Sequence, residues 1–345
     1  MQSILEHLSP KTFARAFVCA AILTIILNAH PYNGAAYAKE AAIKPPKAVS
    51  GAGKEPPLST KAESVELAFP KDYSMGSLYL LKPPGTPGDW DKKFYAQACG
   101  KFAVPRGTTL ELQVSYEACK DFSTLNRLPP GIVTCLSFEG LEIGDKEFKT
   151  LTCLPSLKGL SIIDIDLTNQ GFMLVQNCHS LEKLVVKGTL INGKALAAVR
   201  NLYTLKKLDF ELCDLDDDSI SNLAKLPGLH TLSLRSVKIG DAGVAHLQAL
   251  TSLVKLSLSV NHITDAGIKH LEPLKNLDHL DLRATKITAA CSKTLKTLPR
   301  LQSVRISYFD FTPDAIQAMK RDLPKCYVMD GKDANMPAEI FAPLH

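Results

Sequence analysis

The stretch KIGDAGVAHLQAL (238–250) is followed, after a shift of 24 residues, by HITDAGIKHLEPL (262–274). In these two copies Asp241 aligns with Asp265, and His246 aligns with His270. A phrase repeated at a fixed spacing either carries a binding motif or builds the same structural unit more than once. The rest of the chain decides between these two explanations.

The same spacing of 24 residues organises most of the chain through the apolar frame L-x-x-L-x-L. Frames start at Val133, Leu157, Leu181, Leu205, Leu229, Leu253, Leu277 and Leu301, and a weaker one starts at Thr109. Apolar residues at positions 4 and 6 alternate as in a buried strand, whereas those at 16, 19 and 22 recur as in a helix. Each unit is therefore predicted to be a strand, a turn and a helix, which can bury its apolar side chains only against the next unit.

The frame L-x-x-L-x-L-x-x-[TNC]-x-I-[TG]-D-x-G, seen in LSLSVNHITDAGIKHL and LSLRSVKIGDAGVAHL, resembles a leucine-rich repeat. The resemblance is to the bacterial type in which ITDAG opens the helix, related to the ribonuclease-inhibitor-like repeats. It covers residues 133–325, with a degenerate extension back to 109. It implies an α/β fold: a right-handed solenoid with parallel strands on a concave face and helices on a convex face.

The repeated DAG phrase is predicted to build the unit rather than to bind a ligand. Asp241 and Asp265, at position 13, are expected to accept hydrogen bonds from the first turn of their own helices, worth about 1 kcal/mol each. Gly243 and Gly267, at position 15, leave room where neighbouring turns crowd. A polar residue at position 9, such as Asn261, is expected to satisfy backbone groups of the turns along the stack.

One repeat departs from this pattern in the part that should form a helix. The unit at 277 has Ala289 in place of the position-13 aspartate and Ser292 at an apolar position. We therefore expect its helix to be the weakest.

The N-terminus has the pattern of a secretory signal peptide. Lys11 and Arg15 precede the apolar run AFVCAAILTIIL (16–27), and the segment ends in small residues at AAYA (35–38). This arrangement predicts export and cleavage after Ala38, to the periplasm, the cell surface or the medium. An uncleaved membrane anchor would have a similar sequence, so that alternative stays open.

The remaining chain is divided by composition and by the repeat frame. Short apolar runs bounded by Pro and Gly, namely VELAFP, GSLYLL and KFAVPRG, predict strands of a cap over the first repeat. The predicted organisation is a signal peptide (1–38), a Pro/Ala/Lys-rich linker (39–63), a β-rich N-terminal cap (64–108), the leucine-rich-repeat domain (109–325), and a C-terminal cap and tail (326–345).

Eight of the nine cysteines follow Ala38, which raises the possibility of disulfides in an exported chain. The family resemblance implies a bridge in the cap region, where Cys99 and Cys119 are the candidates. Cys178 and Cys213 take the place of packed repeat residues and are predicted to be buried thiols. A bridge between Cys153 and Cys178 is a poorer candidate.

The sequence gives no pattern for catalysis, a cofactor or a metal. It has no Cys-x-x-Cys, and His246 and His270 fall on the helical face of consecutive units without a recurring carboxylate. The two Ser-x-x-Lys matches, at 180–183 and 252–255, run into predicted strands instead of helices. We therefore predict a protein that is not an enzyme, with no cofactor, no metal site and no catalytic residue.

Charge on the predicted strand face suggests where a partner would bind. Positions 3, 5 and 7 should point away from the core, because successive strand residues alternate sides. Between 181 and 324 these positions carry the basic residues Lys183, Lys187, Lys207, Arg235, Lys255, Arg283 and Arg305. They also carry three acids, Asp209, Glu211 and Asp281, so the face has an excess of four positive charges.

Such a face favours an acidic partner, either a protein or an anionic envelope polymer, and Tyr308 is its main exposed aromatic candidate. The whole chain carries only +5, from 40 basic and 35 acidic residues, which is too little to indicate a nucleic-acid binder. No membrane span is expected unless the N-terminal segment is kept as an anchor. The predicted function is an exported, non-catalytic scaffold for macromolecular recognition; the alternative is a structural or envelope-associated spacer without a selective partner.

Overall fold

The computed structural model describes residues 64–82, 92–120, 122–149, 156–307 and 310–331. Contacts divide the chain into two units, Met1–Thr60 and Lys61–His345, and every described residue belongs to the second. The predicted signal peptide (1–38) and linker (39–63) lie outside the described residues, as do residues 332–345 of the predicted tail.

The second unit is built on a sheet of twelve strands in the order β14-β13-β12-β11-β10-β9-β8-β7-β6-β5-β2-β3. From β5 to β14 neighbouring strands are parallel and follow the chain order. The strands are β1 Ser64–Ala68, β2 Gly76–Leu81, β3 Lys92–Gln97, β4 Lys101–Pro105, β5 Leu110–Val114, β6 Val133–Glu139, β7 Gly159–Ile163, β8 Lys183–Lys187, β9 Lys207–Glu211, β10 Thr231–Arg235, β11 Lys255–Ser257, β12 His279–Asp281, β13 Ser303–Arg305 and β14 Tyr327–Met329.

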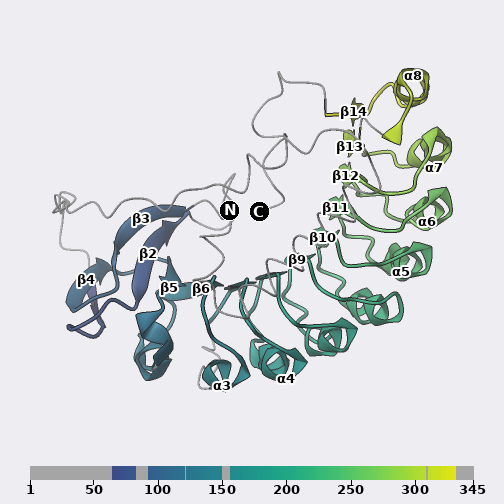
Figure 1. Cartoon of the computed structure of the whole chain (residues 1–345). Helices are drawn as coiled ribbons and strands as arrows, with labels where there is room; N and C mark the ends of the chain where they lie inside the picture. The colour runs from purple at the N-terminus through teal and green to yellow at the C-terminus, as the bar shows by residue number, and fades with distance from the viewer. Residues whose placement is uncertain (1–63, 83–91, 121, 150–155, 308–309, 332–345) are drawn as a thin grey trace, which may run out of the picture. The chain divides into compact units, whose positions relative to one another are not determined.

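Each repeat returns from its strand through a short helical segment, and these segments lie on the outer side of the curved sheet (Figure 1). The α-helices are α3 Asp145–Phe148, α4 Asn169–Phe172, α5 Asp241–His246, α6 Asp265–Lys269, α7 Ser292–Leu295 and α8 Pro313–Asp322. The 3₁₀ helices are Glu117–Lys120, Phe122–Arg127, Met173–Asn177, Gly193–Ala198, Asp218–Lys225, Leu247–Ala249 and Ala289–Cys291. The α/β solenoid expected from the repeat is thus confirmed.

The core lies between the sheet and the helical segments. Strand register confirms the repeat frame, because position 4 of each unit pairs with position 4 of the next, as Leu232 does with Leu256 and Leu256 with Leu280. All three side chains are at most 2% exposed. Stacking aligned leucines removes from water apolar surface that no single repeat could bury alone.

The position-13 aspartate accepts hydrogen bonds, but the predicted donor is wrong. Asp241 does not cap its own helix; instead its Oδ1 accepts the backbone N–H of Thr264 at 2.8 Å, and its Oδ2 accepts the Thr264 hydroxyl at 2.6 Å. Thr264, at position 12 of the next repeat, is the residue that caps α6, by accepting the N–H of Ala266. Asp145 and Asp265 contact Thr168 and Thr288 in the same way. The aspartate therefore ties each repeat to its successor.

This link between repeats explains why position 15 is glycine. A Cβ built on Gly243 would lie 2.5 Å from Oδ1 of Asp217, the aspartate of the preceding repeat, and Gly267 faces Asp241 in the same manner. Neither glycine has a positive φ. The prediction that glycine supplies room is confirmed, and the group that needs the room is the carboxylate of the repeat before.

The expectation that the unit at 277 has the weakest helix is wrong. Thr288 caps its helical segment by accepting the Ala290 N–H, and the buried Ser292 donates its hydroxyl to Asp322 at 2.7 Å. Among the described residues, three other units form 3₁₀ helices without an α-helical turn. They are the units at 109 (Glu117–Lys120 and Phe122–Arg127), 181 (Gly193–Ala198) and 205 (Asp218–Lys225).

The sheet continues at both ends past the strands of the predicted repeats. Three N-terminal strands are confirmed: β1 and β4 form a separate antiparallel pair, and β2 pairs with β5. Strand β3 was not predicted; it pairs with β2 and forms the last strand at that end. At the other end β14 adds one more parallel strand, with Val328 opposite Val304. The predicted boundary between cap and repeats at residue 108 stays a prediction.

Candidate interaction surface on the sheet

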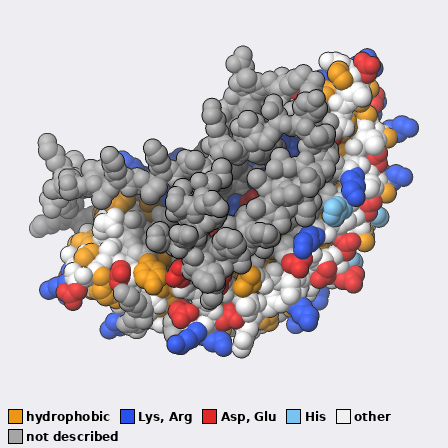
Figure 2. Space-filling model, in the orientation of Figure 1, with side chains coloured by type: hydrophobic (Ala, Val, Ile, Leu, Met, Phe, Trp, Pro, Cys, Tyr) orange, Lys and Arg blue, Asp and Glu red, His pale blue; other side chains and the backbone are white. Residues whose placement is uncertain are grey.

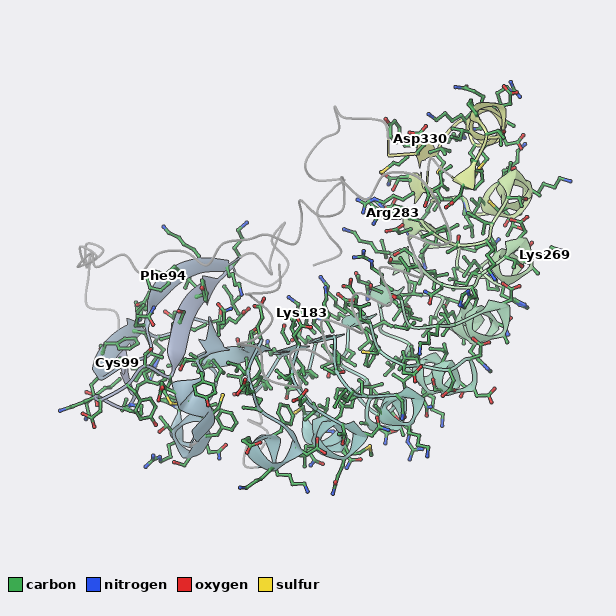
Figure 3. The ribbon with its side chains drawn as sticks, in the orientation of Figure 1. Phe94, Cys99, Lys183, Lys269, Arg283 and Asp330 are labelled. Carbon is green, nitrogen blue, oxygen red and sulfur yellow. The ribbon has the colours of Figure 1, made fainter. Side chains whose placement is uncertain are left out.

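The side chains at positions 3, 5 and 7 form three rows across the strand face that is turned away from the helices. In row 3, Lys183 pairs in register with Lys207, Lys207 with Thr231, and Thr231 with Lys255. Figure 3 shows Lys183 and Arg283 on this side of the sheet and Lys269 on the helical side. Neighbouring strands lie about 4.8 Å apart, so charges in one row are within each other's electrostatic range.

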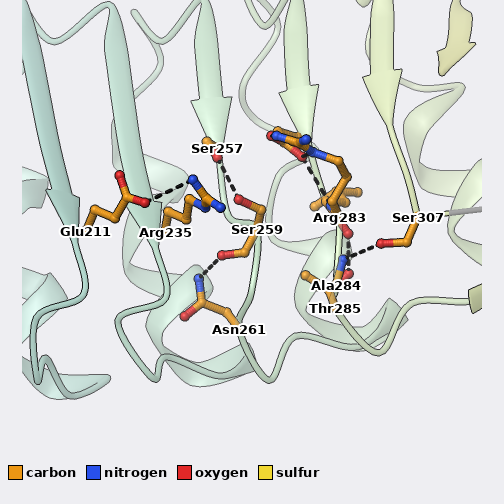
Figure 4. Close-up of polar contacts among 11 residues, drawn as sticks. Glu211, Arg235, Ser257, Ser259, Asn261, Arg283, Ala284, Thr285 and Ser307 are labelled. Carbon is orange, nitrogen blue, oxygen red and sulfur yellow. Dashed lines mark hydrogen bonds and ion pairs between the residues drawn. The ribbon is translucent and has the colours of Figure 1, made fainter. Parts of the chain in front are cut away.

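Three of the seven predicted basic residues are already ion-paired on this face. Lys187 contacts both Asp209 at 3.2 Å and Glu211 at 3.1 Å. Arg235 contacts Glu211 at 2.9 Å, as Figure 4 shows. Both acids raise the pKa of Lys187, outweighing burial, which favours its neutral form. These ion pairs neutralise basic side chains that we had predicted to bind a partner.

Arg283 is likewise ion-paired, with Asp281. Its guanidinium donates hydrogen bonds of 2.9 and 2.7 Å to the two carboxylate oxygens of Asp281, the last residue of β12, which lies two residues earlier in the chain. The three acids thus offset three of the seven basic groups on this face. Of the other four, Lys207 and Lys255 make no ion pair with any described residue. Tyr308 lies outside the described residues.

The centre of the surface is more buried than a solvated lysine row would be. Lys207 is 6% exposed and Asp209, on the same strand, is 5% exposed. Burial, reinforced by the neighbouring Lys183, lowers the pKa of Lys207 to about 7. Burial also lowers the pKa of Lys183, although Glu111 and Cys135 oppose the shift. Lys207 is therefore a buried member of this row and not a freely solvated lysine.

The cysteine predictions need correction. Cys99 and Cys119 are free thiols, and their sulfurs lie against different carbonyls, those of Lys71 and Ser115. The expected bridge between them is not formed. Cys178 is buried as predicted, but it is disulfide-bonded, with a partner outside the described residues.

The remaining buried thiols are not suited to nucleophilic chemistry. Burial raises the pKa of Cys135 to about 12 and that of Cys213 to about 11. A thiol with such a pKa is protonated at neutral pH, and the thiolate is the reactive form. Cys213 lies 3.7 Å from the Thr189 hydroxyl, in the position-9 row that the sequence indicated.

At position 9, the side chain of Asn261 hydrogen-bonds backbone groups of neighbouring turns, as predicted. Its carbonyl oxygen accepts the N–H groups of Val237 and Ile239, and its amide donates to the carbonyl of Leu234 at 2.6 Å. The same amide donates to Ser259 O (Figure 4). These bonds hold consecutive turns in register beside the surface.

A shallow pocket at the edge where the strands begin was missed by sequence reasoning. It has a volume of about 270 Å³ and is lined by Glu182, Tyr203, Thr204, Leu205, Lys206, Gly228 and His230. Tyr203 is 62% exposed, and Glu182 lies between Lys158 and Lys206 at 3.3 and 2.9 Å. The signal available in the sequence was Tyr203 itself, an aromatic residue at the junction of two repeats.

The described residues contain no cluster of His, Cys, Asp or Glu that could hold a metal ion. His246 and His270 are partly exposed on the helical side. In the part of the surface that Figure 2 displays, acidic and basic side chains are interspersed along this outer side. Within the described ranges no helix is both long and apolar enough to cross a membrane.

Comparison with known proteins agrees with this architecture. A family model described as Leucine Rich repeat matches residues 203–224 and 249–271. Among curated proteins, none gives a significant match to the sequence.

Two of the solved structures that are similar are internalins from Listeria monocytogenes. An internalin C2 is 23% identical over 57% of this chain and 80% of its own, with a TM-score of 0.45. A second internalin (inlF) is 20% identical over 57% of this chain and 66% of its own, with a TM-score of 0.36. The register of 24 residues, the sheet with one strand per repeat and the matched family model together show that this chain is a leucine-rich-repeat protein.

Proposed function

We propose that this chain is an exported, non-catalytic scaffold that recognises an acidic protein through the strand face of its repeats. The observation that carries this function is the separation of charge on that face. The three acids of the face form ion pairs with three of its basic residues: Asp209 with Lys187, Glu211 with Arg235, and Asp281 with Arg283. In contrast, Lys207 and Lys255 make no ion pair with any described residue. Buried or crowded cations without a counter-ion favour an anionic partner.

Recognition of this kind is expected to be weak and sensitive to salt. The excess charge acts mainly on the rate and orientation of encounter. The face contributes few of the exposed aromatic side chains that usually anchor tight interfaces. At about 1 M salt the Debye length falls to about 3 Å, so binding through this face should be lost.

Two features support export. The N-terminal segment has the basic, apolar and small-residue regions of a signal peptide. Cys178 is disulfide-bonded, and disulfides persist mainly in oxidising compartments.

Partner capture from the envelope fraction of the native host tests recognition. Three chains are used: wild type, Lys183→Gln/Lys207→Gln/Lys255→Gln, and the control Lys194→Gln/Lys269→Gln/Lys293→Gln. The control lowers the net charge by the same amount but changes exposed lysines of the helical segments. Neutral glutamine is used because Lys207 is buried, and Lys187 is avoided because its loss would strip Asp209 and Glu211 of their ion pair.

A protein retained by wild type and by the control, but not by the strand-face variant, would support the proposed function. Equal retention by all three chains would contradict it and favour the spacer alternative. Export is tested separately by N-terminal sequencing of protein from the native host, where Lys39 should be the first residue. A chain that begins at Met1 in a soluble cytosolic fraction would contradict export.

A further inference from the structure

The shallow pocket at the edge where the strands begin plays no part in the proposed function, and its lining is that of a small-ligand site. Its volume of about 270 Å³ is slightly below the roughly 300–1,000 Å³ of pockets that enclose a drug-sized molecule, so it suits a single ring. The exposed ring of Tyr203 lies in its wall together with three polar side chains, those of Glu182, Lys206 and His230. Ligand sites typically combine an apolar or aromatic wall with a few convergent polar groups of this kind.

Gly228, which also lines the pocket, is a glycine that the fold does not require. Its φ lies outside the positive range, and a Cβ built on it would meet only the carbonyl oxygens of Tyr203 at 3.5 Å and Leu205 at 3.8 Å. Both are ordinary contact distances, unlike the close approach of a carboxylate to Gly243 and Gly267. Neither backbone geometry nor crowding therefore explains glycine at this place, which leaves the open space beside Tyr203 as its effect.

The polar groups of the pocket offer a donor and acceptors side by side. Glu182 Oε2 accepts from Lys206 Nζ at 2.9 Å, and Glu182 Oε1 lies 3.3 Å from Lys158 Nζ. An ionised carboxylate has about four lone-pair sites and an ammonium group has three N–H donors, so both keep capacity for a ligand. His230 Nδ1 lies 2.6 Å from the carbonyl oxygen of Gly228, so in the neutral ring Nδ1 carries the proton and Nε2 stays an acceptor.

We propose that this pocket binds one neutral hexose ring of a glycan. The apolar face of the sugar ring packs on Tyr203, and two adjacent hydroxyls bridge the ion pair, one donating to Glu182 and the other accepting from Lys206. Oxygens on adjacent ring carbons are separated by about the distance between hydrogen-bonded atoms, which matches the 2.9 Å between Glu182 Oε2 and Lys206 Nζ. A further hydroxyl donates to His230 Nε2.

The charges of the pocket favour a neutral ligand that is both donor and acceptor. A carboxylate would meet the carboxylate of Glu182 and a cation would meet Lys206, whereas a hydroxyl can donate to one and accept from the other. A proline ring could also pack on Tyr203, but it has no N–H or O–H with which to donate to Glu182. The inference does not rest on the proposed function, because it uses none of the lysines assigned to the acidic partner.

Affinity electrophoresis of the purified full chain, through native gels that contain a neutral polymer, tests the site. Dextran, mannan and galactan present three hexoses with free hydroxyls on adjacent carbons. Laminarin is the matched control for dextran, because it is also a glucose polymer but its linkage leaves no such pair of hydroxyls on its internal rings. Poly-L-proline represents the peptide alternative. At least one of the first three polymers should retard the wild-type chain, and laminarin and poly-L-proline should not.

Two matched pairs of variants locate the interaction. Tyr203→Ala should weaken binding of the retarding polymer about tenfold, whereas Tyr116→Ala removes a tyrosine of similar exposure outside the pocket and should leave it unchanged. Lys206→Met and Lys158→Met each break an ion pair with Glu182, but only Lys206 lines the pocket. Lys206→Met should therefore weaken binding about tenfold, and Lys158→Met should not. Thermal melts verify that every variant is folded.

Retardation of the wild-type chain by none of the three hexose polymers would overturn the proposal. Equal retardation by dextran and laminarin would overturn the bridging of the ion pair by adjacent hydroxyls, and unchanged binding by Tyr203→Ala would place the glycan elsewhere on the chain. Retardation by poly-L-proline alone, lost in Tyr203→Ala, would assign the pocket to a peptide instead. Failure of the proposed function is a separate result, seen as equal partner retention in the capture experiment.

Discussion

Gly267→Ala should destabilise the wild-type solenoid but should be tolerated in a chain that already carries Asp241→Ala. A Cβ on Gly267 would overlap Oδ1 of Asp241 and would lie 3.1 Å from Cγ2 of Ile263. The carboxylate cannot move away freely, because it holds the N–H and hydroxyl of Thr264 at 2.8 and 2.6 Å. The cost of overpacking is typically about 1–3 kcal/mol.

The magnitudes follow from these contacts. Gly267 lies inside α6, so alanine gains about 1 kcal/mol of helix propensity, which offsets part of the overlap and of the weakened bonds to Thr264. We expect a net loss of roughly 2 kcal/mol in wild type. Asp241→Ala alone should cost roughly 2 kcal/mol, because Thr264 loses both partners. In that background Gly267→Ala should be close to neutral, which gives a coupling of about 2 kcal/mol.

The assay is a double-mutant cycle measured by urea unfolding, followed by both circular dichroism and intrinsic fluorescence so that loss of two-state behaviour is seen. Gly228→Ala is the matched control, since its Cβ would meet only the Tyr203 carbonyl oxygen at 3.5 Å and the Leu205 carbonyl oxygen at 3.8 Å. An equal cost of Gly267→Ala in both backgrounds would refute the idea that the position-15 glycine exists to accommodate the aspartate of the preceding repeat.

Three further outcomes are expected from the same structure. Leu258→Asp should unfold the array, because Leu258 is fully buried and an unpaired carboxylate would enter the stacked core; a circular-dichroism melt like that of wild type would show the register to be wrong. Val260→Asn should stabilise the protein by about 1 kcal/mol, since Val260 has a φ of 58° that asparagine tolerates better than a β-branched residue; a lower melting temperature would contradict this. Lys207→Met should stabilise the fold below pH 7, and this gain should shrink as the pH rises to about 10. The reason is that the native pKa of Lys207 is about 7, so between these pH values the unfolded chain binds a proton that the folded chain does not. A difference in unfolding free energy between variant and wild type that does not change with pH would contradict the idea that burial of charged Lys207 destabilises the fold.

The repeat shows how far a sequence pattern reaches and where it stops. Apolar periodicity identified the strand, the buried leucines and the parallel register, because burial of side chains such as Leu232 and Leu256 depends only on their place in the frame. The role of Asp241 was misassigned, because its partner Thr264 belongs to the next repeat and both a self-cap and a link to that repeat fit the same letters. Spacing cannot tell which of two equivalent neighbours a side chain will reach.

The position-8 residues illustrate the same limit. Leu212, Ser236, Val260 and Ala284 all have positive φ, at the place where Gly140 and Gly188 occur in other repeats. The glycines alone hinted at a left-handed turn. The other residues adopt it because the stacked turns fix the backbone, at a local cost that tertiary packing outweighs.

The sequence by itself determined the α/β solenoid, the face that carries the charges and the excess of basic over acidic side chains on that face. Only the tertiary structure decided which of those charges remain available, because pairing depends on distances between neighbouring strands. Lys187 and Arg235 are neutralised by acids of the neighbouring strand β9, and Arg283 by Asp281, two residues earlier in the chain. Lys207, in contrast, is buried beside Lys183 without an ion pair to a described residue. A count of residues gives the net charge of a surface, but the free energy of each charge depends on burial and on the atoms it meets.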